Sequence, residues 1–377
     1  MGSKLGGGPT LGSMHADVLV ADLVTALGRA ASVIVPTPTM MAYTGAYLVV
    51  AENTVNVYGS DGDTTVTTTI NTQGSTVGGS VLLTPKALLS WLKTLTPSDS
   101  VTLTVDTVSE LSVTSTGSSD PYTFRTLSAT FPLPGKAENI TATDLSDLVA
   151  ALSAVATSAG AADDATRDDV VHVVSTPTSL TLYSTDQFRV TRATLPGASI
   201  GDVSFLMRLK TLQLITKWKP VGIRVEPTGT VTADVGNGTV SVRKLDGVFP
   251  PAEQIVSAPA ANKTTFDGAD AHSALKRLSA VAGEGETLLV TVDGEALTLS
   301  VDAEHVGSGK ETLPISCATP DAVTFGVNVD FFSQALHACN AETVTIEWTS
   351  AMMPVRVSSL EPVNVAVVVM PVRLADA

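Results

Sequence analysis

The chain has 377 residues, a formal net charge of −15 and two cysteines. Its length allows two or three domains with full hydrophobic cores, and its low cysteine count excludes a disulfide-stabilised scaffold. The apolar residues are mostly Val, Ala and Leu, which together with abundant Thr, Gly and Pro is typical of a β-rich fold with some helix. The strong acidity argues against a nucleic-acid partner unless the basic residues are gathered in one place.

Three features bear on the cellular compartment. Cys317 and Cys339 lack the CxxC spacing of a metal or redox site, and we expect them to be buried free thiols of an intracellular protein. No apolar run approaches the roughly 18 residues of a membrane span, so no membrane partner is expected. Residues 1–13 have no signal-peptide core and look like an added linker ahead of Met14. These features predict a cytoplasmic protein whose folded part begins at Met14.

The first part of the chain is predicted to form a strand, a helix, further strands, a second helix and more strands. The first strand covers 15–20 and leads into a helix over 22–32, with Asp22 as its N-cap. The second helix covers 85–95 and has a proline at its first helical position. Further strands are predicted from β-branched, alternating residues at 46–50, 54–58, 64–70, 101–105 and 111–115.

The middle part repeats this order of elements. A helix over 147–160 has apolar residues at helical spacing, which predicts one buried stripe. The members of this stripe are Leu148, Val149, Leu152, Val155, Ala156 and Ala159. A second helix is predicted over 208–219 and ends before Pro220. Strands are predicted at 170–175, 180–184, 189–195, 222–226, 231–235 and 239–244.

The last part contains the same elements a third time. Helices are predicted over 273–283 and 329–338. Between two short apolar runs, Asp293 and Gly294 give the signal of a two-residue hairpin turn. Strands are predicted on either side of this turn and later in the chain, at 288–292, 296–301, 344–348, 354–357 and 365–370.

One helix sequence occurs three times. The copies, which align without gaps, are DLVTALGRAAS at 22–32, DLVAALSAVAT at 147–157 and SALKRLSAVAG at 273–283. They lie about 125 residues apart, a spacing far too long for a solenoid unit but right for a domain. The sequence therefore predicts three similar α+β domains, each with two helices packed on antiparallel sheets.

Charges are distributed unevenly between the helices and the rest of the chain. Six helix windows contain nine basic residues and a single acidic residue, Asp330, although helices accommodate Glu as well as they do Lys and Arg. The windows are 23–34, 85–95, 148–159, 208–219, 273–283 and 329–339. Basic helices on an acidic body suit loose, non-specific contact with phosphates, and they lack the aromatic residues of a single-strand platform. The alternative is that the basic residues are concentrated in the helices by chance, without a functional reason.

Three motifs resemble those of a known family. They are TDQFRVTRATLP at 185–196, KLDGVFPP at 244–251 and VVVMPVRL at 367–374. Their order and spacing are similar to those of the bacterial β sliding clamp, the DNA polymerase III beta subunit, and the resemblance covers residues 14–374. It implies the DNA clamp fold, with domains at 14–133, 134–257 and 258–377, and two chains joined head to tail into a closed ring of six domains.

The resemblance implies a processivity factor and not an enzyme. A homodimeric ring would encircle duplex DNA, slide on it without sequence specificity, and tether DNA polymerase, the clamp loader and repair proteins through short linear motifs. The implied peptide-binding pocket comprises Thr185, Gln187, Phe188, Arg189, Val190, Pro250, Ile255, Val368, Val369, Met370, Pro371, Val372, Arg373 and Leu374. Its apolar walls suit aliphatic and aromatic anchors.

Two further sets of residues are expected to make contacts. Those expected to contact DNA are Arg29, Lys86, Lys93, Arg167, Arg208, Lys210, Lys217, Lys276 and Arg277. By resemblance, the dimer interface would join Trp91, Tyr122 and Phe124 of one chain to the region of Val281 in the second. The three aromatic residues could equally belong to the core.

Some positions depart from the family pattern. Gln187 and Phe188 replace a common Gly-His pair and make the pocket bulkier, and Gln254 replaces a frequent arginine. The loop at 35–39 lacks the arginine that the family often presents to DNA, so Arg29 or Arg167 is expected to compensate. Residues 375–377 extend beyond the usual terminal leucine and could crowd the pocket.

Other functional classes find less support. The five histidines are scattered, and P-loop, GxSxG and HExxH sequences are absent, so no catalytic site, metal or cofactor is expected. One alternative is a β-rich structural protein without a DNA function, which leaves the basic helices unexplained. The second is a clamp paralogue, encoded by a phage or dedicated to repair, with a different choice of partners.

Overall fold

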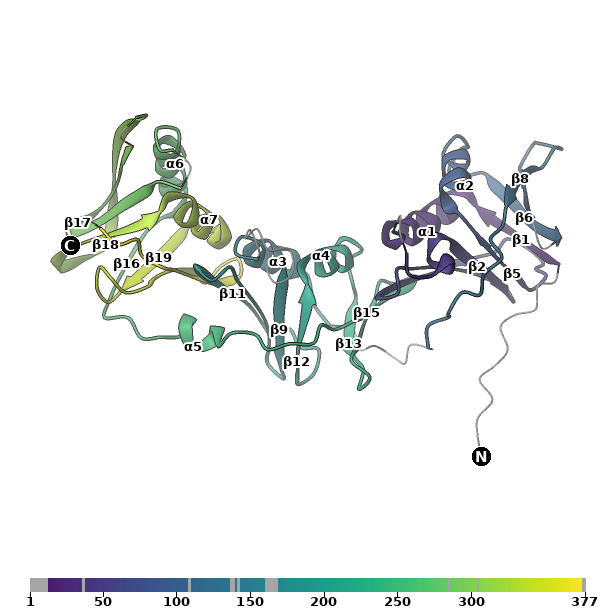
Figure 1. Ribbon diagram of the computed structural model, residues 1–377, viewed down its shortest axis with the longest axis horizontal. Helices are drawn as coiled ribbons and strands as arrows, with labels where there is room; N and C mark the ends of the chain where they lie inside the picture. Colours follow the sequence, from purple (N-terminus) through teal and green to yellow (C-terminus); the bar gives the residue numbers. More distant parts are fainter. Residues whose placement is uncertain are drawn as a thin grey trace. The chain divides into compact units, whose positions relative to one another are not determined.

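A computed structural model gives the fold of the chain (Figure 1). It describes residues 13–374 except 36–37, 108–109, 136–139, 141–142, 160–168, 284 and 304. The chain divides into two compact units. The first unit lies within Met1–Ala142 and Lys219–Arg243, and the second within Thr143–Trp218 and Lys244–Ala377. None of the described helices is long and apolar enough to cross a membrane.

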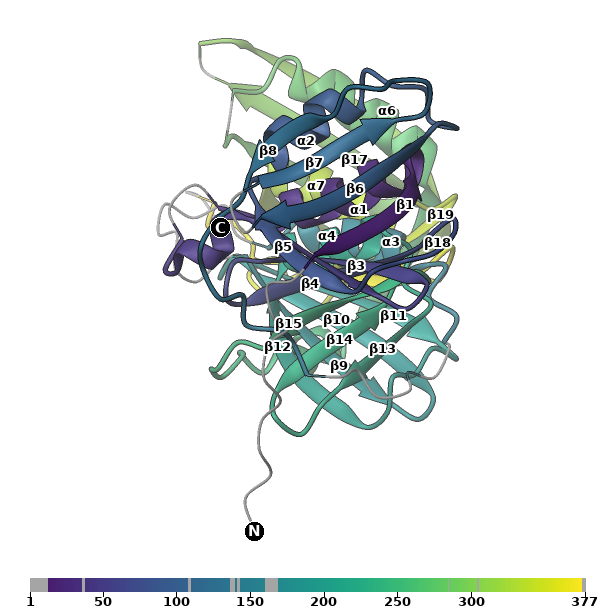
Figure 2. The same cartoon turned by 90° about the vertical axis from the view of Figure 1, so that its right-hand side faces the viewer.

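The first unit contains two antiparallel sheets. The smaller has, in spatial order, β1 (Met14–Leu19), β6 (Ser100–Thr107), β7 (Glu110–Ser115) and β8 (Tyr122–Arg125). Figure 2 shows β1, β6 and β7 side by side on the face toward the viewer. The larger sheet has, in spatial order, β13 (Gly222–Val225), β14 (Thr230–Asp234), β15 (Gly238–Arg243), β4 (Thr64–Asn71), β3 (Thr54–Ser60), β2 (Ala46–Ala51) and β5 (Gly79–Leu83). Pairing of β15 with β4 therefore joins strands of two predicted repeats.

Helix α1 (Val20–Val33) carries the first copy of the repeated sequence and packs on β3 and β4. It buries Leu23, Ala26, Leu27 and Ala30, as an apolar stripe at helical spacing requires. The packing is so close that a Cβ added at Gly59 on β3 would lie 2.5 Å from the carbonyl oxygen of Ala30, so only glycine fits there.

Helix α2 (Pro85–Leu92) lies beside α1 and begins with the predicted proline. A short 3₁₀ helix, η1 (Met41–Thr44), completes the helical elements described in this unit.

The prediction that Asp22 caps the first helix is wrong. Helix α1 follows β1 directly and begins at Val20, so Leu19 occupies the N-cap position. Asp22 instead lies in the first turn, where a negative charge interacts favourably with the positive end of the helix dipole.

The second unit contains an eight-stranded antiparallel sheet and a two-stranded ribbon. In spatial order the sheet has β12 (Val203–Arg208), β9 (Val170–Thr176), β10 (Ser179–Thr185), β11 (Arg189–Pro196), β21 (Asn364–Val369), β20 (Val355–Ser359), β19 (Thr343–Trp348) and β16 (Asn262–Asp267). The ribbon pairs β17 (Thr287–Ala303) with β18 (Gly307–Asn328). Strands β11 and β21 come from different predicted repeats and pair in the middle of the sheet.

Four helices form a row along one face of this sheet (Figure 1). Contacts join them in the order α4 (Leu209–Lys217), α3 (Leu148–Ala156), α7 (Val329–Cys339) and α6 (Gly268–Ser279). The short helix α5 (Ala252–Val256) lies on the opposite face. Ser184 of β10 donates to a carbonyl of α3, whereas the adjacent Tyr183 donates to Glu253 of α5, and successive residues of a strand point to opposite faces.

The predicted hairpin at Asp293 and Gly294 is wrong. Strand β17 continues through these residues and pairs with β18 before and after them, with register shifts on either side of Gly294. Gly294 has a φ of +57°, which glycine adopts without strain. It therefore lies at a bulge within the long ribbon and not at a hairpin turn. The chain reverses only between Ala303 and Gly307, because continuous strand pairing outweighs the local turn preference.

The buried face of α3 also differs from the predicted stripe. Val149 is exposed, whereas Leu148, Ala151, Leu152 and Val155 are buried. These four residues have the spacing of a single helix face, and Val149 lies about 100° around the helix from Leu148.

The six predicted helices are confirmed, with ends that differ by a few residues from those expected. The elements that the sequence did not predict are β5, β8, β12, β16, α5, η1 and the whole of β18. All of them are short except β18, whose pairing with β17 is irregular.

Candidate functional surfaces

Residues far apart in the sequence meet where β11 and β21 pair. Arg189 lies opposite Val369, and Val190 lies opposite Val368. Just beyond the strand ends, the Met370 amide donates to the Phe188 carbonyl at 3.0 Å. The structure therefore brings together residues of the first and third predicted pocket motifs.

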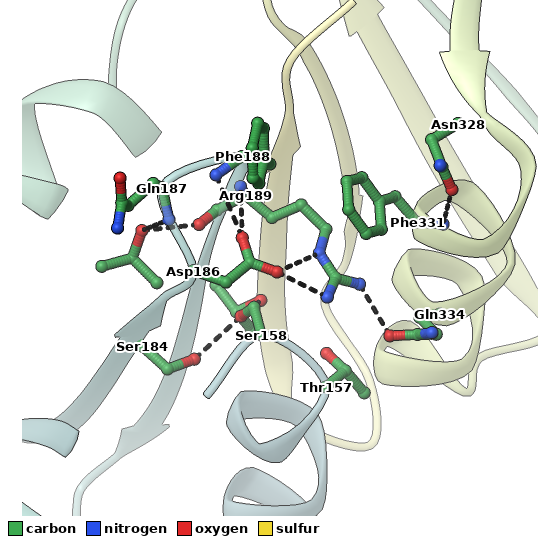
Figure 3. A network of polar contacts seen from close by, with 12 residues as sticks. Thr157, Ser158, Ser184, Asp186, Gln187, Phe188, Arg189, Asn328, Phe331 and Gln334 are labelled. Atoms are coloured by element: carbon green, nitrogen blue, oxygen red, sulfur yellow. Dashed lines mark hydrogen bonds and ion pairs between the residues drawn. The ribbon is translucent and has the colours of Figure 1, made fainter. Parts of the chain in front are cut away.

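The turn before β11 is held by its own side chains (Figure 3). The Asp186 carboxylate accepts from the amides of Phe188, at 3.1 Å, and Arg189, at 2.8 Å. Thr185 accepts from the Gln187 amide and donates to the Arg189 carbonyl. This tight loop gives Gln187 a φ of +75° and leaves its side chain exposed.

Arg189 forms an internal bridge from this turn to α7 (Figure 3). Its side chain is only 3% exposed. Nε and Nη2 donate to Asp186 at 2.9 and 2.7 Å, and Nη1 donates to Gln334 at 2.7 Å. Its guanidinium also lies 4.2 Å from the centre of the Phe331 ring, a cation–π distance. Every guanidinium nitrogen thus has a partner within the chain.

The predicted pocket residues include buried, partly buried and exposed side chains, and the partly buried ones are Thr185, Pro371, Val372 and Leu374. Val190 and Val368 are buried in one apolar cluster with Tyr183, Ala252, Val256 and Ala366, and Val369 is buried on the opposite face of its strand. Phe188 is 59% exposed and Met370 47% exposed. The other exposed members are Gln187, Pro250, Ile255 and Arg373. A partner would meet the exposed group first.

Helix α5 carries Ile255 and is tied to the sheet at its first turn. Tyr183 donates to Glu253 at 2.6 Å, and Arg192 lies 3.5 Å from the same carboxylate. Burial, together with Glu253, raises the pKa of the Tyr183 phenol. Partial burial opposes ionisation of Glu253, but hydrogen bonds from Ser257 and Tyr183 and the charge of Arg192 outweigh it and lower the Glu253 pKa.

A second tie holds the other end of α5. Arg356 on β20 donates through Nη1 to the carbonyls of Val256, at 2.5 Å, and Ala258, at 2.9 Å. Its Nε and Nη2 donate to Glu347 at 2.6 and 2.8 Å. The carbonyl of Val256, the last residue of the helix, has no partner within the helix and is satisfied in this way.

The end of the described chain follows β18. The Val372 amide donates to the Gly326 carbonyl at 2.8 Å. A Cβ added at Gly326 would lie 2.7 Å from the Leu374 side chain, so Leu374 packs directly over this glycine. The predicted crowding by residues 375–377 lies outside the described residues.

Two cavities of the second unit lie elsewhere. One, of about 230 Å³, is lined by residues that include Asp147, Pro196 and Val363. The other, of about 270 Å³, lies between α3 and α7 and includes Ser153 and Cys339. Neither is lined by a predicted pocket residue.

The basic residues expected to contact DNA fall into two groups. Those that are exposed and form no ion pair with a described residue are Lys86, Lys93, Lys210, Lys217 and Lys276. The arginines are already engaged. Arg29 donates to Asn237 at 2.7 Å, Arg208 lies 3.1 Å from Asp169, and Arg277 donates to both oxygens of Glu311. Arg167 lies outside the described residues.

The helices are less free of acidic residues than the sequence windows indicated. Because α1 and α6 begin earlier than expected, they include Asp22 and Asp270 in addition to Asp330 of α7. All three carboxylates lie in first turns, where their negative charge interacts favourably with the positive end of the helix dipole. Lys217, Lys276 and Arg277 lie in last turns, which is the complementary arrangement.

The predicted interface aromatics form one cluster in the first unit. The Trp91 ring lies 4.8 Å from Tyr122 and 6.0 Å from Phe124, measured between centroids. Trp91 and Phe124 pack partly against the core, whereas Tyr122 is 52% exposed on β8, the outer strand of its sheet. In the second unit, Val281 is partly buried against Gly309 of β18.

Metal and thiol chemistry have little support in the part of the chain that the structure describes. No group of His, Cys, Asp and Glu there could hold a metal ion. Cys339 is a buried free thiol, and burial raises its pKa to about 12, which makes it unreactive. The side chain of Cys317 is not among those described.

Comparisons with known proteins agree with this architecture. Family models of the DNA polymerase III beta subunit match at both ends, the N-terminal domain at residues 14–133 and the C-terminal domain at 254–373. A beta sliding clamp from Synechococcus elongatus is 27% identical over 217 residues, which cover 54% of this chain and 57% of the relative. One from a Synechocystis species is 22% identical over 229 residues, covering 55% and 58%. The aligned part thus spans less than two thirds of these relatives.

Solved structures show the same fold. The DNA polymerase III subunit beta from Pseudomonas aeruginosa superposes with a TM-score of 0.85 at 17% identity, covering 96% of this chain and 100% of that one. The sliding clamp from Caulobacter crescentus gives a TM-score of 0.82 at 17% identity with the same coverage. The two matched domains together account for more than half of the sequence, and the chain belongs to the DNA polymerase III beta subunit, or beta sliding clamp, family.

Proposed function

We propose that this protein is a DNA polymerase processivity factor that acts by binding and not by catalysis. In this proposal two chains form a ring that encircles duplex DNA and slides on it in the bacterial cytoplasm. The observation that carries the proposal is that helices in both units of a sliding-clamp fold carry exposed lysines, while the protein as a whole is acidic. Such a layer attracts phosphates without reading bases.

Ring closure follows from a head-to-tail contact. A contact between two different surfaces closes into a ring when the rotation between copies returns to the start. The outer strand β8 pairs only with β7 among the described strands, and its exposed Tyr122 lies beside Trp91. An unpaired strand edge with exposed aromatic residues favours pairing with a second chain. The partner surface is proposed near Val281 of the second chain. The proposed domain bounds are 14–133, 134–257 and 258–377, so Val281 belongs to the third domain.

The weak DNA contact is part of the proposed mechanism. Five exposed lysines without ion pairs supply positive charge, whereas three arginines already have partners within the chain. A ring that is linked topologically to DNA needs only modest attraction, since strong phosphate contacts would oppose sliding. The attraction falls as salt rises, because each phosphate contact releases a bound cation.

The tethering site is proposed at the junction of β11 and β21. There Phe188 and Met370 are exposed just beyond the paired strand ends, and Ile255 is exposed on α5, which packs on β11 and β21. Apolar and thioether side chains on a rigid sheet suit a short extended segment of a partner protein. We propose that DNA polymerase, the clamp loader and repair proteins bind here in turn.

The decisive experiment is a DNA synthesis assay on circular primed DNA with loader and polymerase. The intact chain is expected to lengthen the products, and deletion of residues 370–377 is expected to abolish the effect while the protein remains dimeric. The native mass is expected to be twice 38.7 kDa. A monomer that fails to stimulate synthesis would support the β-rich structural alternative. A dimer that is loaded but does not stimulate the replicative polymerase would support a paralogue.

A further inference from the structure

Phe188 is both exposed and firmly held. Its amide donates to Asp186, and its carbonyl accepts from Met370. Its ring lies 6.0 Å from the Phe331 ring at an interplanar angle of 30°, which is a stacked arrangement (Figure 3). The side chain nevertheless remains 59% exposed. A large apolar side chain fixed in this manner differs from a mobile surface residue, because little conformational entropy remains to be lost on binding.

Phe331 is held from behind by the Arg189 network. The guanidinium lies 4.2 Å from the Phe331 ring centre, and it is itself fixed by the buried Asp186 and by Gln334 on the next turn of α7. The contacts therefore run without interruption from α7 to the exposed face of Phe188. Neither Phe331, Asp186 nor Gln334 belongs to the residue set that the family resemblance assigns to the pocket.

The charges around this surface restrict what can bind. Asp186 and Arg189 neutralise one another in the interior. Arg373, three residues beyond the exposed Met370, is exposed and forms no ion pair with any described residue. A partner segment that is complementary to this surface has an aromatic side chain for Phe188 and Met370 and a carboxylate for Arg373.

We propose that Phe188 determines the specificity of the peptide site by stacking on an aromatic side chain of an acidic partner segment, and that Phe331, Arg189 and Gln334 are the positioning residues that hold it. This inference rests on the proposed tethering function. It also changes the role of Arg189, which acts through Phe331 and does not itself contact the partner.

The test uses two fluorescein-labelled peptides that copy the clamp-binding segment of a bacterial DNA polymerase III catalytic subunit. They differ only in whether the last apolar residue is phenylalanine or leucine. Fluorescence anisotropy gives the dissociation constant of each for the full-length protein. The wild type is expected to prefer the phenylalanine peptide by about twofold to tenfold, since aromatic pairs contribute that much beyond buried area.

Four variants separate specificity from general stability. Phe188→Leu and Phe331→Leu are expected to bring the ratio of the two dissociation constants close to one. Gln334→Ala is expected to lower the ratio, and Gln334→Glu to restore it, because a carboxylate still accepts from Arg189. Gln213→Ala, the same substitution at an exposed position on α4, serves as the control and should leave the ratio unchanged. Circular dichroism verifies that each variant is folded.

The possible failures are distinct. If both peptides bind the wild type but the ratio is unaffected by Phe188→Leu, the specificity role is wrong and the tethering site remains. If Gln334→Glu fails to restore what Gln334→Ala removes, the positioning role is wrong. If the wild type binds neither peptide, the proposed tethering function itself fails, and the inference fails with it.

Discussion

The Arg277 guanidinium donates to both carboxylate oxygens of Glu311, at 2.7 and 2.8 Å. The hydrogen bond from Arg277 lowers the Glu311 pKa, and the same bond raises the Arg277 pKa, so both groups stay charged over the whole physiological range. The adjacent Lys276 is exposed without an ion pair among the described residues. Neighbouring basic residues of one helix turn are therefore unequal in the charge they offer to a phosphate.

Replacing Glu311 should strengthen the proposed DNA contact. In Glu311→Gln the Arg277 side chain no longer has to leave a carboxylate to reach a phosphate. Exposed ion pairs are weak, so the expected gain in DNA affinity is about twofold to fivefold at low salt. The plot of log affinity against log salt should steepen by about 0.9 if one further phosphate is contacted.

The matched control for this experiment is Glu295→Gln, which removes the same charge from an exposed position on β17. Fluorescence anisotropy with a short duplex measures both variants. Equal affinities for the two would show that only net charge matters. Weaker binding by Glu311→Gln would show that Glu311 orients Arg277 for the phosphate instead of competing with it.

At the scale of elements, the five-residue helix α5 is held in place by hydrogen bonds from side chains of the sheet. Arg356 bridges two carbonyls at its end to the half-buried Glu347. Arg356→Ala should leave these acceptors without partners and destabilise the local fold by about 1–3 kcal/mol. The expected result is faster amide hydrogen exchange in α5.

Hydrogen exchange monitored by mass spectrometry measures this effect. Exchange in β13–β15 is the internal reference because those strands belong to the other unit. Arg243→Ala, at an exposed position on β15, is the control substitution and should leave α5 unchanged. Unaltered protection of α5 in Arg356→Ala would mean that the contacts at Tyr183 and Glu253 suffice to hold the helix.

Long and regular elements were predictable from the sequence, whereas short or irregular ones were not. The helices around Leu27, Leu152 and Leu278 were predictable because their apolar spacing repeats over three turns. The hairpin at Gly294 was predicted wrongly because a local turn signal carries no information about the long-range pairing of β17 with β18. Short strands such as β8 have too few residues for a reliable alternation.

The candidate site was predictable as a set of motifs but not as a geometry. The resemblance placed Arg189 and Phe188 in one pocket, yet the sequence alone could not show that Arg189 is buried against Asp186. Burial of that pair depends on Gln334 and Phe331, which lie about 145 residues away in the sequence. A long-range partner of this kind gives no local pattern.

At the scale of the whole molecule, the ring proposal depends on the outer edge of β8. Tyr122→Glu should weaken the dimer, because it places a charge among the Trp91 and Phe124 rings at the proposed contact. Loss of a central aromatic contact weakens association by about 30-fold or more. The variant is expected to run as a 38.7 kDa monomer at low micromolar concentration.

Analytical ultracentrifugation provides the measurement, and Met352→Glu provides the control. Met352 is 53% exposed, nearly the same as Tyr122, but it belongs to the second unit and to no predicted interface. The fold should survive in both variants, since neither side chain is buried. If Tyr122→Glu remains a dimer while Met352→Glu dissociates, the chains associate through a different surface. A stable dimer in both would place the contact away from these two side chains, and the head-to-tail ring through β8 would have to be abandoned.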